Sequence, residues 1–112
     1  MIQQETDTYI KVCMKSWLLC ESCVHAEMNS KNPRYDLINE CMACAKACFA
    51  VVSRLVSDAD DMENLPLNCL LHCRQCVQEC QKYPHESDIR LCSDVCAICA
   101  ETVKDLAVFS AN

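Results

Sequence analysis

The chain has 112 residues, of which thirteen are cysteine and none is glycine, and it carries a net charge of -6 with an isoelectric point near 4.9. A chain of this length predicts a single Cys-rich domain over residues 1–112. The acidic balance, without a cluster of basic residues that could neutralise phosphates, argues against a nucleic-acid partner.

The beginning of the chain predicts no export. Residues 1–12 contain Glu5, Asp7 and two glutamines, so they lack the basic and apolar regions of a secretory signal. No later stretch has the length and hydrophobicity of a membrane span. We therefore expect a cytoplasmic location, where thiols are kept reduced, and no membrane partner. An odd number of cysteines also cannot close completely into intramolecular disulfides.

The predicted fold class is all-α, an antiparallel up-down-up-down four-helix bundle with a Cys-lined core. The absence of glycine argues against strands, hairpins and zinc knuckles. Asn32 and Pro33 predict an N-cap followed by a first helical residue, with Asp36 in the first turn, and Ser87 predicts a second N-cap. Short connections make sequential helices antiparallel neighbours. The predicted helices span residues 4–29, 33–57, 64–82 and 87–109.

The cysteines recur at spacings of three, four and seven, which place side chains on one face of a helix. Packing four such stripes antiparallel predicts facing rings of thiols. The outermost ring holds Cys23, Cys41, Cys80 and Cys92; the next holds Cys20, Cys44, Cys76 and Cys96; the third holds Cys48, Cys73 and Cys99 with either Cys13 or Ser16. Apolar packing is expected to close the other end, through Tyr9, Val51, Leu55, Leu65 with Cys69, Val103, Leu106 and Phe109.

Converging thiols are ligands for soft metal ions. Two thiolates from one helical turn can hold one ion in near-linear coordination, which suits Cu(I) and fits tetrahedral Zn(II) poorly. If each thiolate bridges two ions, the core binds about one Cu(I) per cysteine, roughly thirteen in all. The predicted metal ligands are Cys13, Cys20, Cys23, Cys41, Cys44, Cys48, Cys69, Cys73, Cys76, Cys80, Cys92, Cys96 and Cys99.

Other functions are compatible with so many thiols. A bundle could sequester soft metals generally, including Ag(I), Cd(II) and Zn(II), or it could consume its thiols as a redox scavenger. Iron–sulfur binding and thioredoxin chemistry fit less well, because the ferredoxin spacing is missing and the Cys-x-x-Cys pairs lie in mid-helix. Cysteine as a plain small core residue does not account for thirteen on four inward stripes. We expect no catalytic turnover.

Three segments resemble the four-helix-bundle copper storage proteins, a family of bacterial Cys-rich Cu(I)-binding bundles. They are residues 69–80 (CLLHCRQCVQEC), 92–99 (CSDVCAIC) and 41–49 (CMACAKACF). The resemblance extends over the whole chain, and its cytosolic branch fits best. It implies copper storage or detoxification and association into homotetramers. In-register positions where the family continues its cysteine ladder carry other residues here, namely Ser16, Glu27, Leu37, Ile89 and Val103.

Non-cysteine ligands are expected at the end where the thiol rings begin. The family has histidines near that end, and His85 could take copper from a donor such as a copper chaperone and pass it inward. Met28 is the best thioether candidate. The remaining candidates are expected to be structural: His25 at the surface, His72 at a helix flank, Met14 and Met42 in packing or an interface, and Trp17 at the core edge. Glu27 could be a hydrated residue at the rim.

Overall fold

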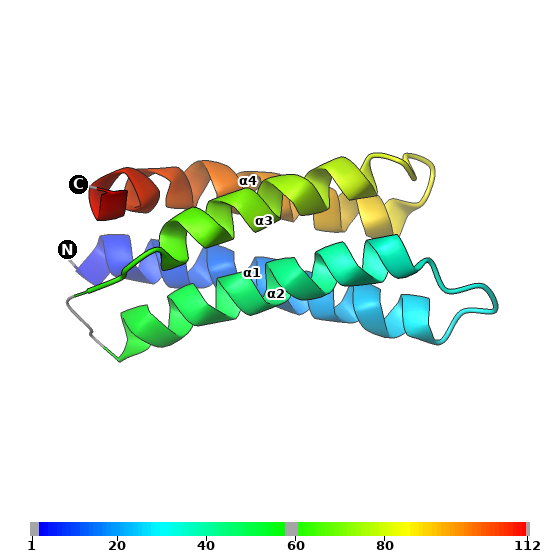
Figure 1. Ribbon diagram of the computed structural model, residues 1–112, viewed down its shortest axis with the longest axis horizontal. Coiled ribbons are helices and arrows are strands. Elements are labelled where there is room, and N and C mark those ends of the chain that lie inside the picture. Colours follow the sequence, from blue (N-terminus) through cyan, green and yellow to red (C-terminus); the bar gives the residue numbers. More distant parts are fainter. Residues whose placement is uncertain (1–2, 58–60, 112) are drawn as a thin grey trace.

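The computed structural model describes residues 3–57 and 61–111, with side chains for residues 4–57 and 61–107. Four α-helices alternate in direction along an elongated body of 45 × 21 × 20 Å (Figure 1). The predicted antiparallel bundle is therefore confirmed. The helices are α1 (Gln3–Met28), α2 (Tyr35–Val56), α3 (Leu65–Cys80) and α4 (Ser87–Ala111).

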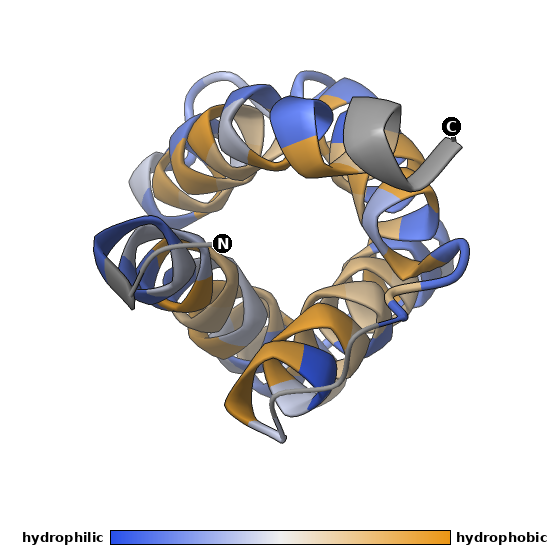
Figure 2. Cartoon of the chain, turned by 90° about the vertical axis from the view of Figure 1, so that its left-hand side faces the viewer, coloured by the Kyte–Doolittle hydropathy of each residue, from blue (hydrophilic) through white to orange (hydrophobic). Residues whose placement is uncertain are grey.

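The helices form a ring around one core. Each helix packs against the next along the chain, and α1 also packs against α4. Within the described residues, the diagonal pairs α1 with α3 and α2 with α4 have no Cα atoms within 8 Å of each other, and they meet across the core through side chains such as Cys44 and Cys96. Seen along the axis, hydrophobic residues occupy the inner sides of all four helices and hydrophilic residues the outer sides (Figure 2). This arrangement follows from the 3.6-residue period of the cysteine stripes.

The second helix begins later than the sequence predicts. Asn32 and Pro33 precede the helix, and Arg34 is its N-cap with extended backbone and no side-chain cap hydrogen bond. The backbone N–H of Arg34 instead donates to Glu27 at 3.0 Å, which holds this residue outside the helix. The prediction of a Pro33 helix start was wrong for this reason, whereas Asp36 lies in the first turn as expected.

The fourth helix begins at the expected place with its cap displaced by one residue. Ser87 is the first helical residue rather than the N-cap. The carbonyl of Glu86 accepts the hydrogen bond from the N–H of Arg90 at 3.0 Å, so Glu86 has the cap position. Asp88 lies in the first turn, where a negative charge stabilises the helix dipole.

Helix ends are closed by polar side chains, because the chain has no glycine to adopt a left-handed C-cap. At the end of α1, the Asn29 side chain donates to the carbonyl of His25 and the Ser30 hydroxyl donates to the carbonyl of Glu27, both at 2.8 Å. Before α3, Glu63 has a positive φ of 52°. For a residue with a Cβ, this left-handed backbone conformation lowers the stability of the fold by about 1 kcal/mol.

The end of the bundle that holds the two chain termini is closed by apolar side chains. Val51 and Val103 are fully buried and Leu106 is 4% exposed. Tyr9, Leu55 and Leu65 are half-buried. The side chain of Phe109 lies outside the described residues.

Among residues 3–57 and 61–111, none of the helices combines the length and the hydrophobicity that crossing a bilayer requires.

Packing at the closed end predicts the cost of opening a cavity there. Val51→Ala removes two methyl groups from a fully buried position and should lower the free energy of unfolding by about 1 to 3 kcal/mol. Val56→Ala, at a position 67% exposed on the same helix, is the matched control and should change stability by less than about 0.5 kcal/mol. Urea denaturation of the reduced protein measures both, and equal effects would contradict the closed end.

Candidate metal centre

The thiols converge on the bundle axis. Twelve of the thirteen cysteines are buried, Cys23 is half-buried, and all thirteen are free thiols. Three sets of four sulfurs have every Sγ within 4.8 Å of the others. These sets are Cys20, Cys41, Cys76 and Cys92; Cys20, Cys44, Cys76 and Cys96; and Cys48, Cys69, Cys73 and Cys99. Two sets share Cys20 and Cys76, and the contact between Cys44 and Cys73 at 3.6 Å connects the third set to them, so the sulfurs form one stack rather than isolated sites.

The middle ring predicted from the sequence is confirmed, because Cys20, Cys44, Cys76 and Cys96 form one of the three sets. Cys41 and Cys92, which we expected in the outermost ring with Cys23 and Cys80, group with Cys20 and Cys76 in one of the three sets. Cys23 nevertheless hydrogen-bonds with both Cys41 and Cys92, and Cys80 hydrogen-bonds with Cys41. Cys23 lies about 60° around α1 from Cys20, and Cys80 is the last residue of α3, so both lie at the margin of the stack.

The third ring also differs from the prediction. Cys69, which we expected among the apolar residues of the closed end, groups with Cys48, Cys73 and Cys99. The sulfurs of Cys69 and Cys73 lie 4.0 Å apart across one turn of α3, so they act at the same level of the stack.

Both candidates for the fourth member of that ring face the sulfurs, but at different levels. Cys13 contacts Cys99 with an Sγ–Sγ distance of 3.8 Å. The Ser16 hydroxyl lies 3.2 Å from the sulfur of Cys96, one level higher. Ser16, Leu37 and Val103 are fully buried. Ile89 and Glu27 are 4% and 6% exposed, so all five in-register substitutions do face the core.

Hydrogen bonds among the thiols dominate their acidity. The hydrogen bond of Cys76 with Cys20, followed in size by the one with Cys41, raises the pKa of Cys76. The hydrogen bond of Cys41 with Cys20, followed in size by the one with Cys23, lowers the pKa of Cys41. The hydrogen bond with Cys41 has the largest effect on the pKa of Cys23 and raises it. The hydrogen bond with Cys92 lowers this pKa and burial raises it, and the result is a pKa of about 12 for Cys23. Titration therefore belongs to the connected thiols as a set rather than to single residues. A metal cation that enters must displace protons from this set.

A pocket of about 510 Å³ opens at the end of the bundle where α1 joins α2 and α3 joins α4. Its lining includes Cys23, Glu27, Arg34, His85, Glu86 and Asp88. We call this opening the mouth. Because Cys23 is the cysteine with partial exposure and lies in the mouth, it connects solvent to the buried stack.

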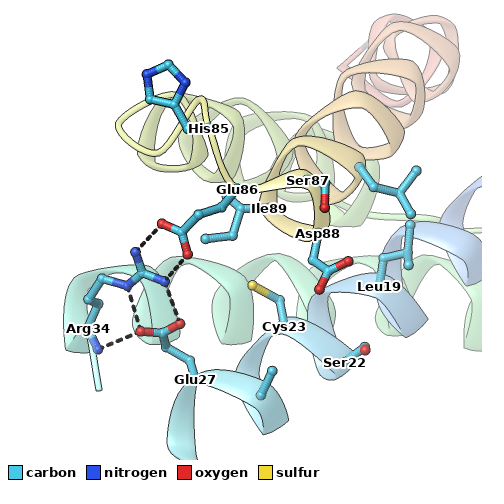
Figure 3. A pocket seen from close by; sticks show the side chains of 12 residues that line it. Leu19, Ser22, Cys23, Glu27, Arg34, His85, Glu86, Ser87, Asp88 and Ile89 are labelled. Carbon is cyan, nitrogen blue, oxygen red and sulfur yellow. Dashed lines mark hydrogen bonds and ion pairs between the residues drawn. The ribbon is translucent and has the colours of Figure 1, made fainter. Parts of the chain in front are cut away.

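An ion-pair network, here called the rim network, lies over the mouth and consists of Glu27, Arg34 and Glu86 (Figure 3). Arg34 Nε donates to Glu27 Oε1 at 2.7 Å and Nη2 donates to Glu27 Oε2 at 2.9 Å. The same guanidinium donates to both carboxylate oxygens of Glu86, at 2.6 and 2.9 Å. It also stacks over the ring of Tyr83 at 4.3 Å. Glu27 is therefore an anchored residue and not the hydrated one that we considered.

Arg34 also governs the acidity of the rim. Its hydrogen bonds lower the pKa values of Glu27 and Glu86. Partial burial raises both pKa values, but by less. Two carboxylates share one guanidinium, so the rim network carries a net negative charge at neutral pH.

The two non-cysteine ligand candidates lie near the mouth but away from the sulfurs. His85 lines the mouth and is exposed, and Figure 3 shows its ring pointing away from Cys23. Met28 is the last residue of α1 and is 57% exposed. Neither contacts a cysteine among the described interactions, so their roles as ligands stay predictions.

The residues expected to be structural are consistent with that assignment. His25 is exposed and bonded to Asn29. His72 is half-buried. Trp17 is half-buried and packs on Phe49, with ring centroids 5.0 Å apart. Met14 and Met42 are 38% and 41% exposed.

Sequence reasoning missed Arg34. The available signal was Glu27, a carboxylate in register with a stripe of buried residues. A buried carboxylate requires a cationic partner, and Arg34 is the first arginine after Glu27 in the chain.

The buried Glu79 was also missed. It is 8% exposed, and its Oε1 pairs with Lys82 at 3.0 Å. Its Oε2 has no hydrogen-bond partner among the described residues.

The chain is similar to a known protein family. The family model described as copper storage protein matches residues 2–108. Searches of curated proteins and of solved structures found no significant match.

The rim network predicts a pH-dependent contribution to stability. Arg34→Gln should lower the free energy of unfolding by about 1 to 3 kcal/mol at pH 7, because it leaves the buried Glu27 carboxylate without its main partner. The folded pKa values of Glu27 and Glu86 are lowered, so this stabilisation is present above their ordinary value near 4.5 and is lost as the pH falls through the folded values. The difference between variant and wild type should therefore shrink at pH 3.

Urea denaturation at pH 7 and pH 3 measures this difference. Arg90→Gln is the control, since Arg90 is an exposed arginine of the same end for which the described residues give no ion pair. A cost for Arg34→Gln that is equal at both pH values would contradict the network.

Proposed function

The chain belongs to the copper storage protein family, and from this premise we propose that it stores copper as Cu(I), bound by the thiolates of all thirteen cysteines inside the bundle. The observation that carries the proposal is the stack of buried sulfurs, in which the four sulfurs of each set lie within 4.8 Å of one another and two of the three sets share members. Shared members favour bridging thiolates, and bridging leads to about one Cu(I) per cysteine. Storage of this kind requires no catalytic turnover.

Charge supports a monovalent ion. A buried thiolate without a counterion is strongly unfavourable, and one Cu(I) per thiolate leaves the filled core close to neutral. The empty core avoids the charge by keeping its thiols protonated, so loading releases about one proton per ion. Soft thiolates also select the cuprous ion over harder metals.

Tetrahedral ions are the main alternative cargo. Sulfurs around Zn(II) lie about 3.8 Å apart, given Zn–S bonds of about 2.3 Å, and the Sγ–Sγ distances of 3.6 Å for Cys20–Cys96 and 3.8 Å for Cys41–Cys76 are close to this value. However, the two sets that share Cys20 and Cys76 can both hold a four-coordinate ion only if these two thiolates bridge the ions. Such an ion would also leave two uncompensated negative charges per buried site. The alternative therefore predicts two or three Zn(II) and a partly unused core.

A redox scavenger fits the thiols less well. Such a function needs accessible thiols with lowered pKa values. The hydrogen bonds from Cys69 and then Cys99 lower the pKa of Cys13 to about 5, but Cys13 is fully buried. Cys23 is the accessible thiol, and its pKa is raised.

We propose that copper enters and leaves at the mouth, where Cys23 is the first thiolate to accept it from a small thiol or a copper chaperone. The rim network then separates the stack from solvent. His85 and Met28 are proposed as transient ligands on the outer side of this network, consistent with their exposure. At the opposite end, the buried apolar side chains of Val51, Val103 and Leu106 oppose such a route.

Assembly and location complete the proposal. Trp17, Phe49, Met14 and Met42 present partly exposed apolar surface on α1 and α2, and we propose that this face contributes to a homotetramer of the kind the family resemblance implies. Thirteen free thiols at hydrogen-bond distance from one another require a reducing compartment, which supports the cytoplasm.

Copper titration is the direct test of capacity. Anaerobic Cu(I) added in competition with a chromogenic chelator should bind to about thirteen equivalents with little change in helical circular dichroism, because the helices exist without metal. Replacing Cys73 and Cys76 together by Ser should remove roughly two equivalents. Saturation at two or three equivalents, matched by Zn(II), would favour the tetrahedral alternative instead.

Thiol labelling distinguishes storage from redox scavenging. In the empty protein, a disulfide reagent such as Ellman's should modify Cys23 first and the twelve buried thiols only on the timescale of local unfolding. Cys23→Ser should abolish the first phase, whereas Cys13→Ser, at a fully buried position, should leave it intact. Rapid modification of most thiols in the folded protein would support the scavenger.

A further inference from the structure

A single hydroxyl interrupts the sulfur stack. Ser16 is fully buried on α1 between Cys13 and Cys20. Its Oγ lies 3.2 Å from the sulfur of Cys96 and 3.8 Å from that of Cys44, and the Cys48 thiol donates to it at 3.5 Å. All three contacts of the hydroxyl are with sulfur, so Ser16 occupies a position that a fourteenth thiol would have continued.

A serine hydroxyl cannot replace that thiol as a copper ligand. Its oxygen is a hard donor, whereas Cu(I) binds soft sulfur. It also stays protonated at neutral pH, so it cannot offset the charge of a cation that binds beside it. The α1 side of the stack therefore has no ligand at the level of Ser16.

The thiols fall into two groups on either side of this level. An outer group adjoins the mouth, and its sulfurs contact one another as in the pairs Cys20–Cys92 and Cys44–Cys96, both at 3.8 Å. It comprises Cys20, Cys23, Cys41, Cys44, Cys76, Cys80, Cys92 and Cys96. An inner group lies towards the closed end and comprises Cys13, Cys48, Cys69, Cys73 and Cys99. Its sulfurs contact one another as in the pair Cys48–Cys69 at 3.7 Å.

Cys44 is the outer thiol that joins the two groups among the described residues. It hydrogen-bonds with Cys73 at 3.6 Å and also with Cys48, and the latter bond lowers the pKa of Cys48. The other direct connection runs through oxygen, because Ser16 contacts Cys44 and Cys96 on the outer side and Cys48 on the inner side. Sulfur contact between the groups is thus confined to the α2–α3 side of the core.

We propose that Ser16 divides the store into an outer compartment of eight thiols and an inner compartment of five, which exchange copper through Cys44 and its inner neighbours Cys73 and Cys48. This inference rests on the proposed Cu(I) function and on entry at the mouth. In each transfer inward, a Cu–S bond to Cys73 or Cys48 forms as the bond to Cys44 breaks, and the proton of the accepting thiol moves to the Cys44 thiolate. Copper remains Cu(I), so no oxidant or reductant takes part. The inner compartment fills last and empties last.

Release kinetics test the division. Fully loaded protein is mixed anaerobically with an excess of a chromogenic Cu(I) chelator, and release is followed by absorbance. Wild type should release copper in two phases, and the ratio of the fast to the slow amplitude should be about eight to five. Ser16→Cys should add one equivalent of capacity and merge the phases, because it restores a sulfur path on the α1 side. Ser16→Ala is the control without hydroxyl or thiol, and it should keep both phases and the wild-type capacity.

The link itself is tested by Cys44→Ser against Cys96→Ser. Each variant removes one thiol of the outer group, so each should lose about one equivalent. Only Cys44→Ser should slow the inner phase further. Circular dichroism confirms that the variants compared are folded, and the two pairs of variants make the test independent of any single substitution.

The outcomes separate this inference from the proposed function. Capacity near thirteen with a single release phase in wild type would overturn the division and leave copper storage intact. The division is also overturned if Ser16→Cys gains capacity while its slow phase is unchanged, or if Cys44→Ser and Cys96→Ser behave alike. Capacity of two or three equivalents would overturn copper storage itself.

Discussion

The cost of burying a charged sulfur is the constraint on which the rest of this structure depends. A core of thiols packs as a set of small hydrophobic groups while every sulfur keeps its proton, and twelve of the thirteen cysteines are buried on that basis. Once the protons leave, the same core is stable only if a monovalent cation replaces each of them. The choice of cargo therefore follows from burial as much as from the affinity of sulfur for soft metals.

The rim network applies the same constraint at the surface. Glu27 occupies an inward position where the charge of a carboxylate would be costly, and the bidentate hydrogen bonds from Arg34 compensate that charge. Arg34 in turn ties the α1–α2 connection to Glu86 before α4. The open end of the bundle is thereby held together by charge, whereas the other end is held by Val51 and Val103. Charged contacts exchange with water more readily than buried apolar side chains do, which is consistent with the copper entry that we propose at the mouth.

Much of the fold was predictable, because a helical stripe of cysteines fixes which face turns inward. The ring of Cys20, Cys44, Cys76 and Cys96 followed from the stripes and the alternating direction of the helices alone. The grouping of Cys69 did not follow, because helical spacing does not reveal how side chains lean along the axis. The start of α2 was missed for a different reason: the local preference of Pro33 for a first helical turn was overridden by the tertiary contact between Arg34 and Glu27. Ligand roles for His85 and Met28 depend on contacts outside any stripe, and periodicity contains no information about those.

The pair of Trp17 and Phe49 gives the molecule an optical property of its own. Trp17 is the single tryptophan of the chain, is half-buried, and follows directly after Ser16 on α1. Its indole therefore lies beside the level where the outer and inner thiols meet, and Phe49 at 5.0 Å restrains its orientation. Indole emission responds to heavy ions and to changes of polarity nearby. The intrinsic fluorescence of the unlabelled protein should thus report the arrival of metal at the middle of the bundle, separately from the number of ions bound.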